Sequence, residues 1–338
     1  MSAYFIPQGE RIKCTLCPHY CNVAPGRTGI CGVRKNNGTE IVLTTYGIVS
    51  GYSLDPVEKK PLYHFFPGHN IFSVGSFGCN MRCDFCQNYG ISQVVPHDSG
   101  RKITAEEIIS AMSSSEHNIG IAFTYNEPTI SFEFIRDISR KVIGSGYKTV
   151  LVSNGYVNIE PLKEIISFTD AFNIDLKAFD QEFHKKLTGA NLQPVLESLK
   201  LVSRSGRHLE ITSLIIPGFN DTEEGMKKQA EWIAAELGPD VPLHLSRYYP
   251  MYKRDDPATS NQTLERLYDT ASGILDYVYI GNLNLNKGQN TYCPSCGKTI
   301  TERSGYRTIN VNADSTGNCS GCGRKIYKEF IFSSQKDR

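Results

Sequence analysis

The stretch "FGCNMRCDFCQN", residues 77–88, carries three cysteines, Cys79, Cys83 and Cys86, in the spacing C-x3-C-x2-C. Three thiols this close together are more than packing needs, and they are one short of the four ligands that close a tetrahedral metal site. A [4Fe–4S] cluster has four iron corners, each of which takes a ligand. Three thiolates would leave one iron open, and an open corner suits binding and reducing a substrate. We therefore expect an open iron–sulfur site at this loop.

A zinc knuckle is the alternative interpretation of the same three cysteines. It would have to take its fourth ligand from a distant residue such as His64 or His69. Structural zinc sites favour paired C-x2-C knuckles, which this loop does not provide. The open iron–sulfur site is therefore the stronger prediction.

All eleven cysteines of the chain fall into three groups, and none is left over as a lone core residue. An odd number of cysteines in a chain without a secretion signal argues against a disulfide framework. Thiolates prefer zinc and iron–sulfur centres, so we expect two closed four-cysteine metal sites beside the open one. The members of these two closed groups are Cys14, Cys17, Cys21 and Cys31 near the N-terminus, and Cys293, Cys296, Cys319 and Cys322 near the C-terminus.

The two closed groups differ in what their spacing predicts. The C-terminal group consists of two C-x2-C knuckles, each followed by glycine, which is the pattern of a structural zinc ribbon. A segment of about fifty residues is too small to fold on core burial alone, so the metal would supply folding energy. The N-terminal group has one C-x2-C pair only. Zinc and an auxiliary [4Fe–4S] cluster are both open there, because each accepts four thiolates.

The composition is that of a soluble cytoplasmic protein. The chain has 338 residues, 40% of them hydrophobic, and 36 Lys+Arg against 35 Asp+Glu give a net charge of +1. This balance gives no reason to expect a nucleic-acid footprint or a membrane-seeking surface, although RNA stays open as a substrate or as a ligand of the ribbon. No apolar run approaches the ~20 residues of a membrane-spanning helix. The N-terminus, "MSAYFIPQGER", lacks the apolar region of a signal peptide.

The central part of the chain alternates apolar, β-branched runs with helical patterns, which predicts an α/β fold with a parallel sheet. One helix pattern opens at Thr104 with Glu107 three residues on, as a capping box does. We expect strands over residues 71–78, 119–126, 147–154, 170–177, 208–217, 242–249 and 277–283.

Polar sequences directly follow several of these strands, and they help to choose between two architectures. In a (β/α) barrel the loops after the strands meet on one face, whereas a doubly wound open sheet spreads them along an edge. We therefore predict a partial (β/α) TIM-like barrel over residues 61–285. A Cys-rich metal-binding lobe is expected over residues 1–60, and a zinc-ribbon-like domain over residues 286–338.

The cluster loop, written Cys79-x3-Cys83-x-Phe85-Cys86, resembles that of the radical S-adenosylmethionine (radical SAM) enzymes. The resemblance implies that the amino and carboxylate groups of S-adenosylmethionine chelate the open iron. An electron from the cluster then cleaves the sulfonium bond, and the 5′-deoxyadenosyl radical abstracts hydrogen from a substrate. It also implies an oxygen-sensitive protein that works under anaerobic conditions with an electron donor such as ferredoxin or flavodoxin.

The same resemblance assigns cofactor contacts to residues after the strands. Glu127 would accept hydrogen bonds from the ammonium of the methionine moiety, a strong charge-assisted contact, although Tyr125-Asn126 stands where many members have two glycines. Asn154 would contact the ribose or the carboxylate.

Further along the chain, Asp175 and Lys177 match an Asp-x-Lys element that contacts the methionine end and the ribose, with a surface ion pair as the alternative. Phe85 would pack against the adenine. His244 and Arg247, on the sixth expected strand, would point near the site, or be ordinary core or rim residues.

Nearly the whole chain, from about Cys14 to about Cys322, resembles the AmmeMemoRadiSam-system radical SAM proteins, relatives of pyruvate formate-lyase activating enzyme. "CTLCPHYCNVAPGRTGICGVR", "PLYHFFPG" and "HLSRYYPMYK" carry this likeness. It implies Memo-type and AMMECR-type partners but no particular substrate, which could be a small molecule, a peptide or RNA. Two alternatives remain: an activase of a glycyl radical enzyme, and a non-catalytic iron–sulfur or zinc sensor.

Overall fold

The computed structural model describes residues 4–95, 100–283 and 285–331. Its centre is a sheet of eight strands in the order β15-β14-β13-β12-β11-β10-β8-β7. All neighbours from β8 to β15 pair in parallel, and β7 adds an antiparallel edge. The strands are β7 (Gly51–Pro56), β8 (Asn70–Gly75), β10 (Asn118–Phe123), β11 (Lys148–Ser153), β12 (Ala171–Asp175), β13 (His208–Ile215), β14 (Leu243–Arg247) and β15 (Val278–Gly281).

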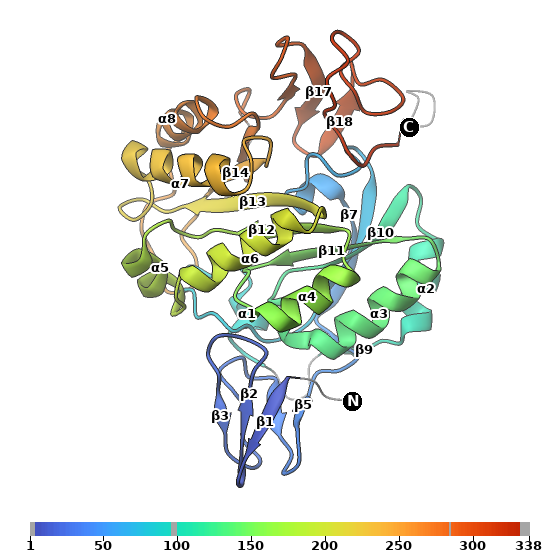
Figure 1. The fold of residues 1–338 in the computed structure, drawn as a ribbon, viewed down its shortest axis with the longest axis vertical. Helices are drawn as coiled ribbons and strands as arrows, with labels where there is room; N and C mark the ends of the chain where they lie inside the picture. Colours follow the sequence, from blue (N-terminus) through green and yellow to red (C-terminus); the bar gives the residue numbers. More distant parts are fainter. Residues whose placement is uncertain (1–3, 96–99, 284, 332–338) are drawn as a thin grey trace.

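The order of the parallel strands decides between the two predicted architectures. It follows the chain without a reversal, whereas a doubly wound sheet reverses at a switch point. Successive right-handed crossovers then place the helices on one side, and the sheet curls into a partial barrel. The helices form this outer row in Figure 1. They are α2 (Ala105–Ser113), α3 (Phe132–Gly144), α4 (Ile159–Ser167), α5 (Gln181–Thr188), α6 (Gln193–Arg204), α7 (Glu223–Glu236) and α8 (Asn261–Ser272).

Local sequence explains where the helices begin and how they pack. Thr104 caps α2 in the predicted capping box: its hydroxyl accepts from the Glu107 N–H, and the Glu107 carboxylate accepts from the Thr104 N–H. In α3 the residues Phe132, Ile135 and Ile138 are buried on one face at helical spacing. The predicted strands and helices are thereby confirmed, with ends that differ by one to a few residues.

The N-terminal lobe is built from short antiparallel strands. The strands β1 (Phe5–Gln8), β2 (Arg11–Cys14) and β3 (Asn22–Val23) form one sheet, and β4 (Arg34–Asn36) and β5 (Ile41–Leu43) form a hairpin. Strand β7 lies within the segment 1–60 but belongs to the central sheet, where it pairs with β8. The lobe therefore continues directly into the edge of the barrel.

The C-terminal lobe consists of β16 (Thr291–Tyr292), β17 (Thr299–Ser304) and β18 (Arg307–Asn310), and lies at the other end of the molecule from the N-terminal lobe (Figure 1). Polar contacts fix it to the barrel. The buried Arg303 guanidinium donates to the Tyr63 carbonyl at 2.9 Å and lies over the Tyr63 ring. His64 bridges the two parts: its Nδ1 lies 3.3 Å from the Ile326 carbonyl oxygen of the lobe, and its Nε2 lies 2.6 Å from the Tyr279 hydroxyl of β15. The sequence "PLYHFF" thus anchors the lobe to the barrel.

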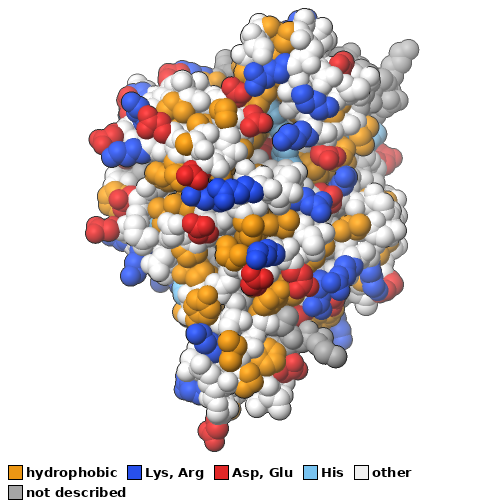
Figure 2. Space-filling model, viewed as in Figure 1, with side chains coloured by type: hydrophobic (Ala, Val, Ile, Leu, Met, Phe, Trp, Pro, Cys, Tyr) orange, Lys and Arg blue, Asp and Glu red, His pale blue; other side chains and the backbone are white. Residues whose placement is uncertain are grey.

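Acidic and basic side chains are interspersed over the face shown in Figure 2, as the net charge of +1 leads one to expect. Within the described ranges, none of the helices has the length and apolar character needed to span a membrane.

Candidate functional site

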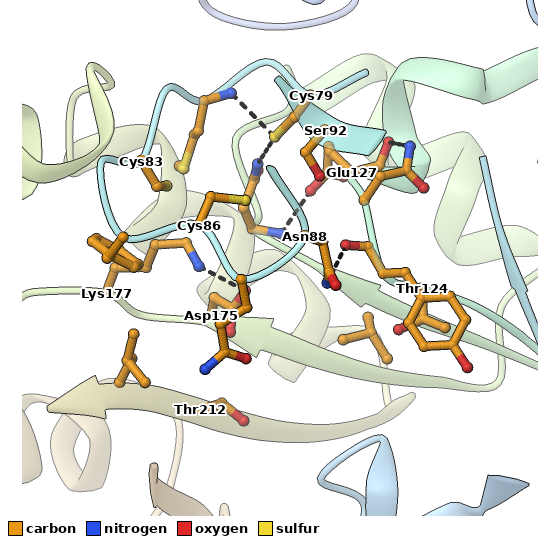
Figure 3. Close-up of a pocket in the computed structure, with 18 of the residues that line it drawn as sticks. Cys79, Cys83, Cys86, Asn88, Ser92, Thr124, Glu127, Asp175, Lys177 and Thr212 are labelled. Carbon is orange, nitrogen blue, oxygen red and sulfur yellow. Dashed lines mark hydrogen bonds and ion pairs between the residues drawn. The ribbon is translucent and has the colours of Figure 1, made fainter. Parts of the chain in front are cut away.

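A cavity of about 310 Å³ opens at the carboxyl ends of the parallel strands, and the cysteine loop forms one of its walls (Figure 3). In parallel α/β folds this end of the sheet is where functional loops converge. Seven of the lining residues come from the four neighbouring strands β11 to β14 or the loops that follow them. These are Val152 and Asn154, Asp175 and Lys177, Thr212 and Leu214, and Ser246.

All three loop cysteines line this cavity. The loop lies between β8 and the short helix α1 (Tyr89–Ser92), and hydrogen bonds to the end of α5 and within the loop itself hold it. The Arg82 N–H donates to the Thr188 carbonyl at 2.7 Å, and the Met81 N–H donates to Cys79 Sγ at 3.3 Å. Gly78 has φ +83°, which favours glycine, and a Cβ there would lie 2.5 Å from the Cys31 carbonyl oxygen.

Glu127 is buried at the cavity wall and accepts four hydrogen bonds from the protein. Its Oε1 accepts from the Thr129 N–H and hydroxyl, at 3.0 and 2.6 Å, and from the Ser153 hydroxyl at 2.8 Å. Its Oε2 accepts from the Asn154 N–H at 2.7 Å. Burial raises the pKa of Glu127, although these donors oppose the shift. The carboxylate therefore links two strand ends and keeps acceptor capacity on Oε2.

Asn154 lies against the cysteine loop. Its Nδ2 donates to Asn80 Oδ1 at 2.9 Å and approaches Cys79 Sγ at 3.6 Å, and its Oδ1 accepts from the Tyr156 N–H at 2.9 Å. Asn80 in turn donates to the Tyr156 carbonyl at 2.7 Å. The two asparagines thus fix the position of Cys79. The role of Asn80 was not predicted, because its signal is only its place directly after Cys79.

Asp175 and Lys177 form an ion pair of 2.9 Å that lines the cavity, with side chains 31% and 15% exposed. The Lys177 side chain is 15% exposed and lies 5.8 Å from the centre of the Phe85 ring. Burial lowers the pKa of Lys177, but the negative charges of the Asp175 carboxylate and of the Cys83 thiolate outweigh it and hold that pKa above its usual value. Asn220 donates to the Lys177 carbonyl at 3.0 Å and fixes the backbone. The pair therefore places a permanent cation beside the cysteine loop.

Tyr125 stands where many radical SAM enzymes are expected to have glycine. Its backbone has φ +73°, in the left-handed region that favours glycine. Such a conformation costs a non-glycine residue about 1–3 kcal/mol. Its hydroxyl donates to Asp55 Oδ2 at 2.6 Å, and Asp55 also pairs with Lys59 and Lys60 at 2.8 and 2.7 Å. Tyr125 and both lysines line the cavity, a group that sequence reasoning missed because its members come from separate segments.

The buried thiols fit a metal centre. Burial raises the pKa of Cys79 well above its usual value and that of Cys83 to about 12. Such thiols become thiolates only when a metal replaces the proton. Sulfur donors of this kind select iron–sulfur clusters or zinc, and no further cysteine and no histidine is among the described residues that line the cavity. Three thiolates with room beside them match a cluster that leaves one corner open.

Four residues that the sequence analysis related to the site lie elsewhere. His64 and His69, offered as a fourth zinc ligand, do not line the cavity, and His64 Nδ1 lies 3.3 Å from the Ile326 carbonyl oxygen of the C-terminal lobe. The expectation that His244 and Arg247 point near the site is wrong. His244 is buried against Glu210, with Nε2 2.6 Å from Oε2, and Arg247 donates to Asn261 at 3.3 Å. Strand β14 instead presents Ser246 to the cavity.

The two four-cysteine groups lie in the two terminal lobes. In the C-terminal lobe the four Sγ atoms all lie within 4.8 Å of one another, and the pairs Cys293–Cys322 and Cys296–Cys319 are separated by 3.5 and 3.6 Å. This spacing fits a single four-coordinate ion. The N-terminal cysteines line a second, smaller hollow.

Comparison with known proteins relates the barrel to the radical SAM enzymes that the cysteine loop resembles. The sequence profile of the Radical SAM superfamily matches residues 73–230. A radical SAM methyltransferase from Sphaerobacter thermophilus has a similar fold, with a TM-score of 0.52, at 14% sequence identity over 64% of this chain and 67% of that one.

Two relatives are similar over different lengths. "Uncharacterized protein MJ0808" of Methanocaldococcus jannaschii is 40% identical over 322 residues, which are 94% of this chain and 95% of that protein. Pyruvate formate-lyase 1-activating enzyme of Escherichia coli is 26% identical over 183 residues, 52% of this chain and 73% of that enzyme. The likeness to the first relative therefore includes both lobes.

Proposed function

Because the chain belongs to the radical SAM superfamily, we propose that Cys79, Cys83 and Cys86 hold a [4Fe–4S] cluster and that S-adenosylmethionine occupies the adjoining cavity. When bound, the cluster supplies the electron that splits S-adenosylmethionine into methionine and a 5′-deoxyadenosyl radical, which abstracts hydrogen from a substrate. The observation that carries this proposal is that three thiols of one loop line a cavity at the carboxyl ends of the strands, and that no other described cysteine or histidine does. Cys83 is buried there, and Cys79 and Cys86 are partly buried.

The residues around the loop have separate roles in this proposal. Lys177 offers a cation to the methionine carboxylate, and Asp175 holds that lysine in place. Glu127 offers its remaining acceptor capacity on Oε2 to the ammonium. Asn154 keeps Cys79 in position through the loop and is thereby a positioning residue, while Phe85 supplies an apolar surface for the adenine.

Anaerobic turnover tests the proposal directly. The reconstituted protein is incubated with S-adenosylmethionine and dithionite, and methionine and 5′-deoxyadenosine are quantified. We expect both products from the wild type and none from Cys83→Ala. Gly90→Ala is the matched control, because it adds a methyl group to the neighbouring helix α1 where no atom lies within 4 Å. Cleavage that persists in Cys83→Ala would show that the loop has been assigned wrongly.

A second candidate, activation of a glycyl radical enzyme, has specific support. Relatives at 26% and 27% identity are pyruvate formate-lyase activating enzymes, and they cover 52% and 62% of this chain. In that case the hydrogen donor is a glycine of a partner protein. A glycyl radical doublet in the electron paramagnetic resonance (EPR) spectrum of a mixture with a glycyl radical enzyme from the same organism supports this candidate. Rapid turnover on a small molecule, a peptide or RNA contradicts it.

The remaining assignments concern partners and the C-terminal metal. Memo-type and AMMECR-type proteins, with a ferredoxin or flavodoxin as electron donor, follow from the family resemblance, and co-purification under anaerobic conditions tests them. Zinc at the C-terminal cysteines is supported by their spacing. A non-catalytic sensor would bind the same metals, but it would release no 5′-deoxyadenosine.

A further inference from the structure

The four N-terminal cysteines surround one hollow, although they span eighteen residues of sequence. Cys14 ends strand β2, and the others lie on the loops around β3. The rest of the lining consists of Leu16, His19, Gly29, Ile30, Arg34 and Ile130. Four sulfur donors that converge on a shared hollow form a complete ligand set for a metal centre.

The spacing of these sulfurs differs from that in the C-terminal lobe. A tetrahedral zinc ion with Zn–S bonds of about 2.3 Å holds its sulfurs about 3.8 Å apart. The C-terminal pairs at 3.5 and 3.6 Å come close to that value, and all four sulfurs lie within 4.8 Å of one another. Within the described part of the chain theirs is the one group of three or more possible ligands placed closely enough to share a metal ion. The described N-terminal four do not form such a group, and neither do the three of the cluster loop.

This difference has a simple chemical meaning. The thiolates of a [4Fe–4S] cluster bind different irons at the corners of a cube, so they stand farther apart than thiolates that share one ion. In this chain the spacing of the N-terminal sulfur atoms is like that of the cluster loop and unlike that of the zinc ribbon. Its spacing therefore favours the iron–sulfur cluster over zinc, the two options that the sequence left open.

The N-terminal hollow shares a wall with the cysteine loop of the barrel. The Cys31 carbonyl oxygen faces Gly78, the residue before Cys79, so closely that a Cβ on Gly78 would lie 2.5 Å from it. His19 Nε2 lies 2.7 Å from the Asn80 carbonyl oxygen, directly after Cys79. The Arg82 guanidinium also donates to the Ile30 carbonyl. Segments that carry ligands of one site thus contact the loop that carries ligands of the other.

Cys21 also lines an open groove on the outer side of the lobe. Arg11, Arg27 and His19 line this groove, and none of the described residues in its lining is acidic. A basic groove beside a ligand of the hollow suits an acidic electron carrier. The hollow therefore lies between a surface that a carrier can reach and the loop where the electron is used.

We propose that Cys14, Cys17, Cys21 and Cys31 bind a second [4Fe–4S] cluster that relays single electrons to the cluster at Cys79, Cys83 and Cys86. A low-potential one-electron carrier loses one electron, and the N-terminal cluster is reduced from the 2+ to the 1+ state. It returns to 2+ as the cluster in the barrel goes from 2+ to 1+, and no bond or proton is involved. Zinc has no redox chemistry and could not take this part. The relay rests on the proposed function, but the metal assignment does not.

Metal analysis of the anaerobically purified wild type tests the assignment. Ligand counting predicts about eight irons and one zinc per chain, against about four irons and two zincs if the N-terminal group holds zinc. We expect two reduced EPR signals, of which S-adenosylmethionine shifts only the one from the open cluster. Four irons with two zincs, or a single signal that S-adenosylmethionine shifts completely, would overturn the second cluster.

A cysteine variant tests the relay. Cys17→Ser should lose about half of the iron, by the same ligand counting, and keep the signal that S-adenosylmethionine shifts. Cleavage driven by reduced flavodoxin should fall by an order of magnitude or more, while cleavage driven by dithionite, a small reductant, stays near the wild-type rate. Equal rates with both reductants relative to the wild type would refute the relay. If Cys17→Ser does not fold, Cys21→Ser is measured in the same way, and the metal content of the wild type decides the assignment.

These outcomes separate this inference from the proposed function. If the protein has eight irons but releases no 5′-deoxyadenosine, the proposed function fails and the second cluster stands. If it releases 5′-deoxyadenosine with four irons and two zincs, the proposed function stands and the second cluster fails.

Discussion

The ion pair between Arg34 and Glu133 joins the N-terminal lobe to helix α3 of the barrel, and its removal has a calculable effect. The two side chains meet in a bidentate contact of 2.7 and 2.9 Å, and they are 2% and 9% exposed. Glu133→Gln keeps the shape of the side chain but leaves the Arg34 cation without its carboxylate. Breaking a buried pair in this way costs about 3–5 kcal/mol, because a buried charge is left uncompensated.

This free energy converts into a measurable melting shift. An unfolding entropy of about 2.1 cal/mol/K per residue amounts to about 0.7 kcal/mol/K for 338 residues. The expected fall in melting temperature is therefore about 4–7 °C, measured by scanning calorimetry or circular dichroism on metal-loaded protein without oxygen. The apolar double variant Arg34→Met with Glu133→Leu should recover most of this loss, since a well-packed apolar pair often replaces a buried ion pair without cost.

A matched control lies on an exposed helix surface. Glu224 pairs with Lys228 in α7 at 2.7 Å, with side chains 80% and 63% exposed, so Glu224→Gln should leave the melting temperature unchanged. The reasoning is refuted if Glu133→Gln and Glu224→Gln have the same melting temperature. It is also refuted if the apolar double variant is as unstable as Glu133→Gln.

Four further outcomes are expected. Burial lowers the pKa of His64 from 6.5 to about 3. Between these two pH values the unfolded chain therefore binds one more proton at this residue than the folded chain does. The free energy of unfolding should therefore fall by about 1.4 kcal/mol per pH unit through this residue as the pH drops below 6.5, and chemical unfolding at several pH values should show a shallower loss in His64→Gln. Thr104→Ala removes the capping box of α2 and should cost about 1 kcal/mol, whereas an unchanged melting temperature would mean that the cap contributes nothing. Asn154→Ala frees the loop around Cys79, so S-adenosylmethionine cleavage should slow with the iron content unchanged, and wild-type kinetics would contradict a positioning role. Cys322→Ser should release the C-terminal metal and loosen that lobe, which faster hydrogen exchange in β17 and β18 would report, while an unchanged zinc content would show that Cys322 is not a ligand.

The sequence by itself predicted the cofactor chemistry and determined the order of the elements. Local signals were sufficient there: the spacing of Cys79, Cys83 and Cys86, the capping box at Thr104, and the alternation of buried strands with helices all act within a few residues. The parallel architecture followed, and the uninterrupted strand order then selected the partial barrel over the doubly wound sheet. The spacing of the two C-terminal knuckles likewise predicted a compact four-cysteine site.

Only the tertiary structure decided which distant groups meet. His244 lies on a strand whose end reaches the cavity, yet its side chain pairs with Glu210, because burial forces each polar group to find a partner where packing places one. The joining of Asp55, Lys60 and Tyr125, and the contact of Cys31 with Gly78, depend on segments that the chain brings together from far apart. Spacing along the sequence limits which residues can be ligands of one centre, but the distances between their sulfur atoms, which separate one shared ion from a cube of four irons, exist only once the fold has formed.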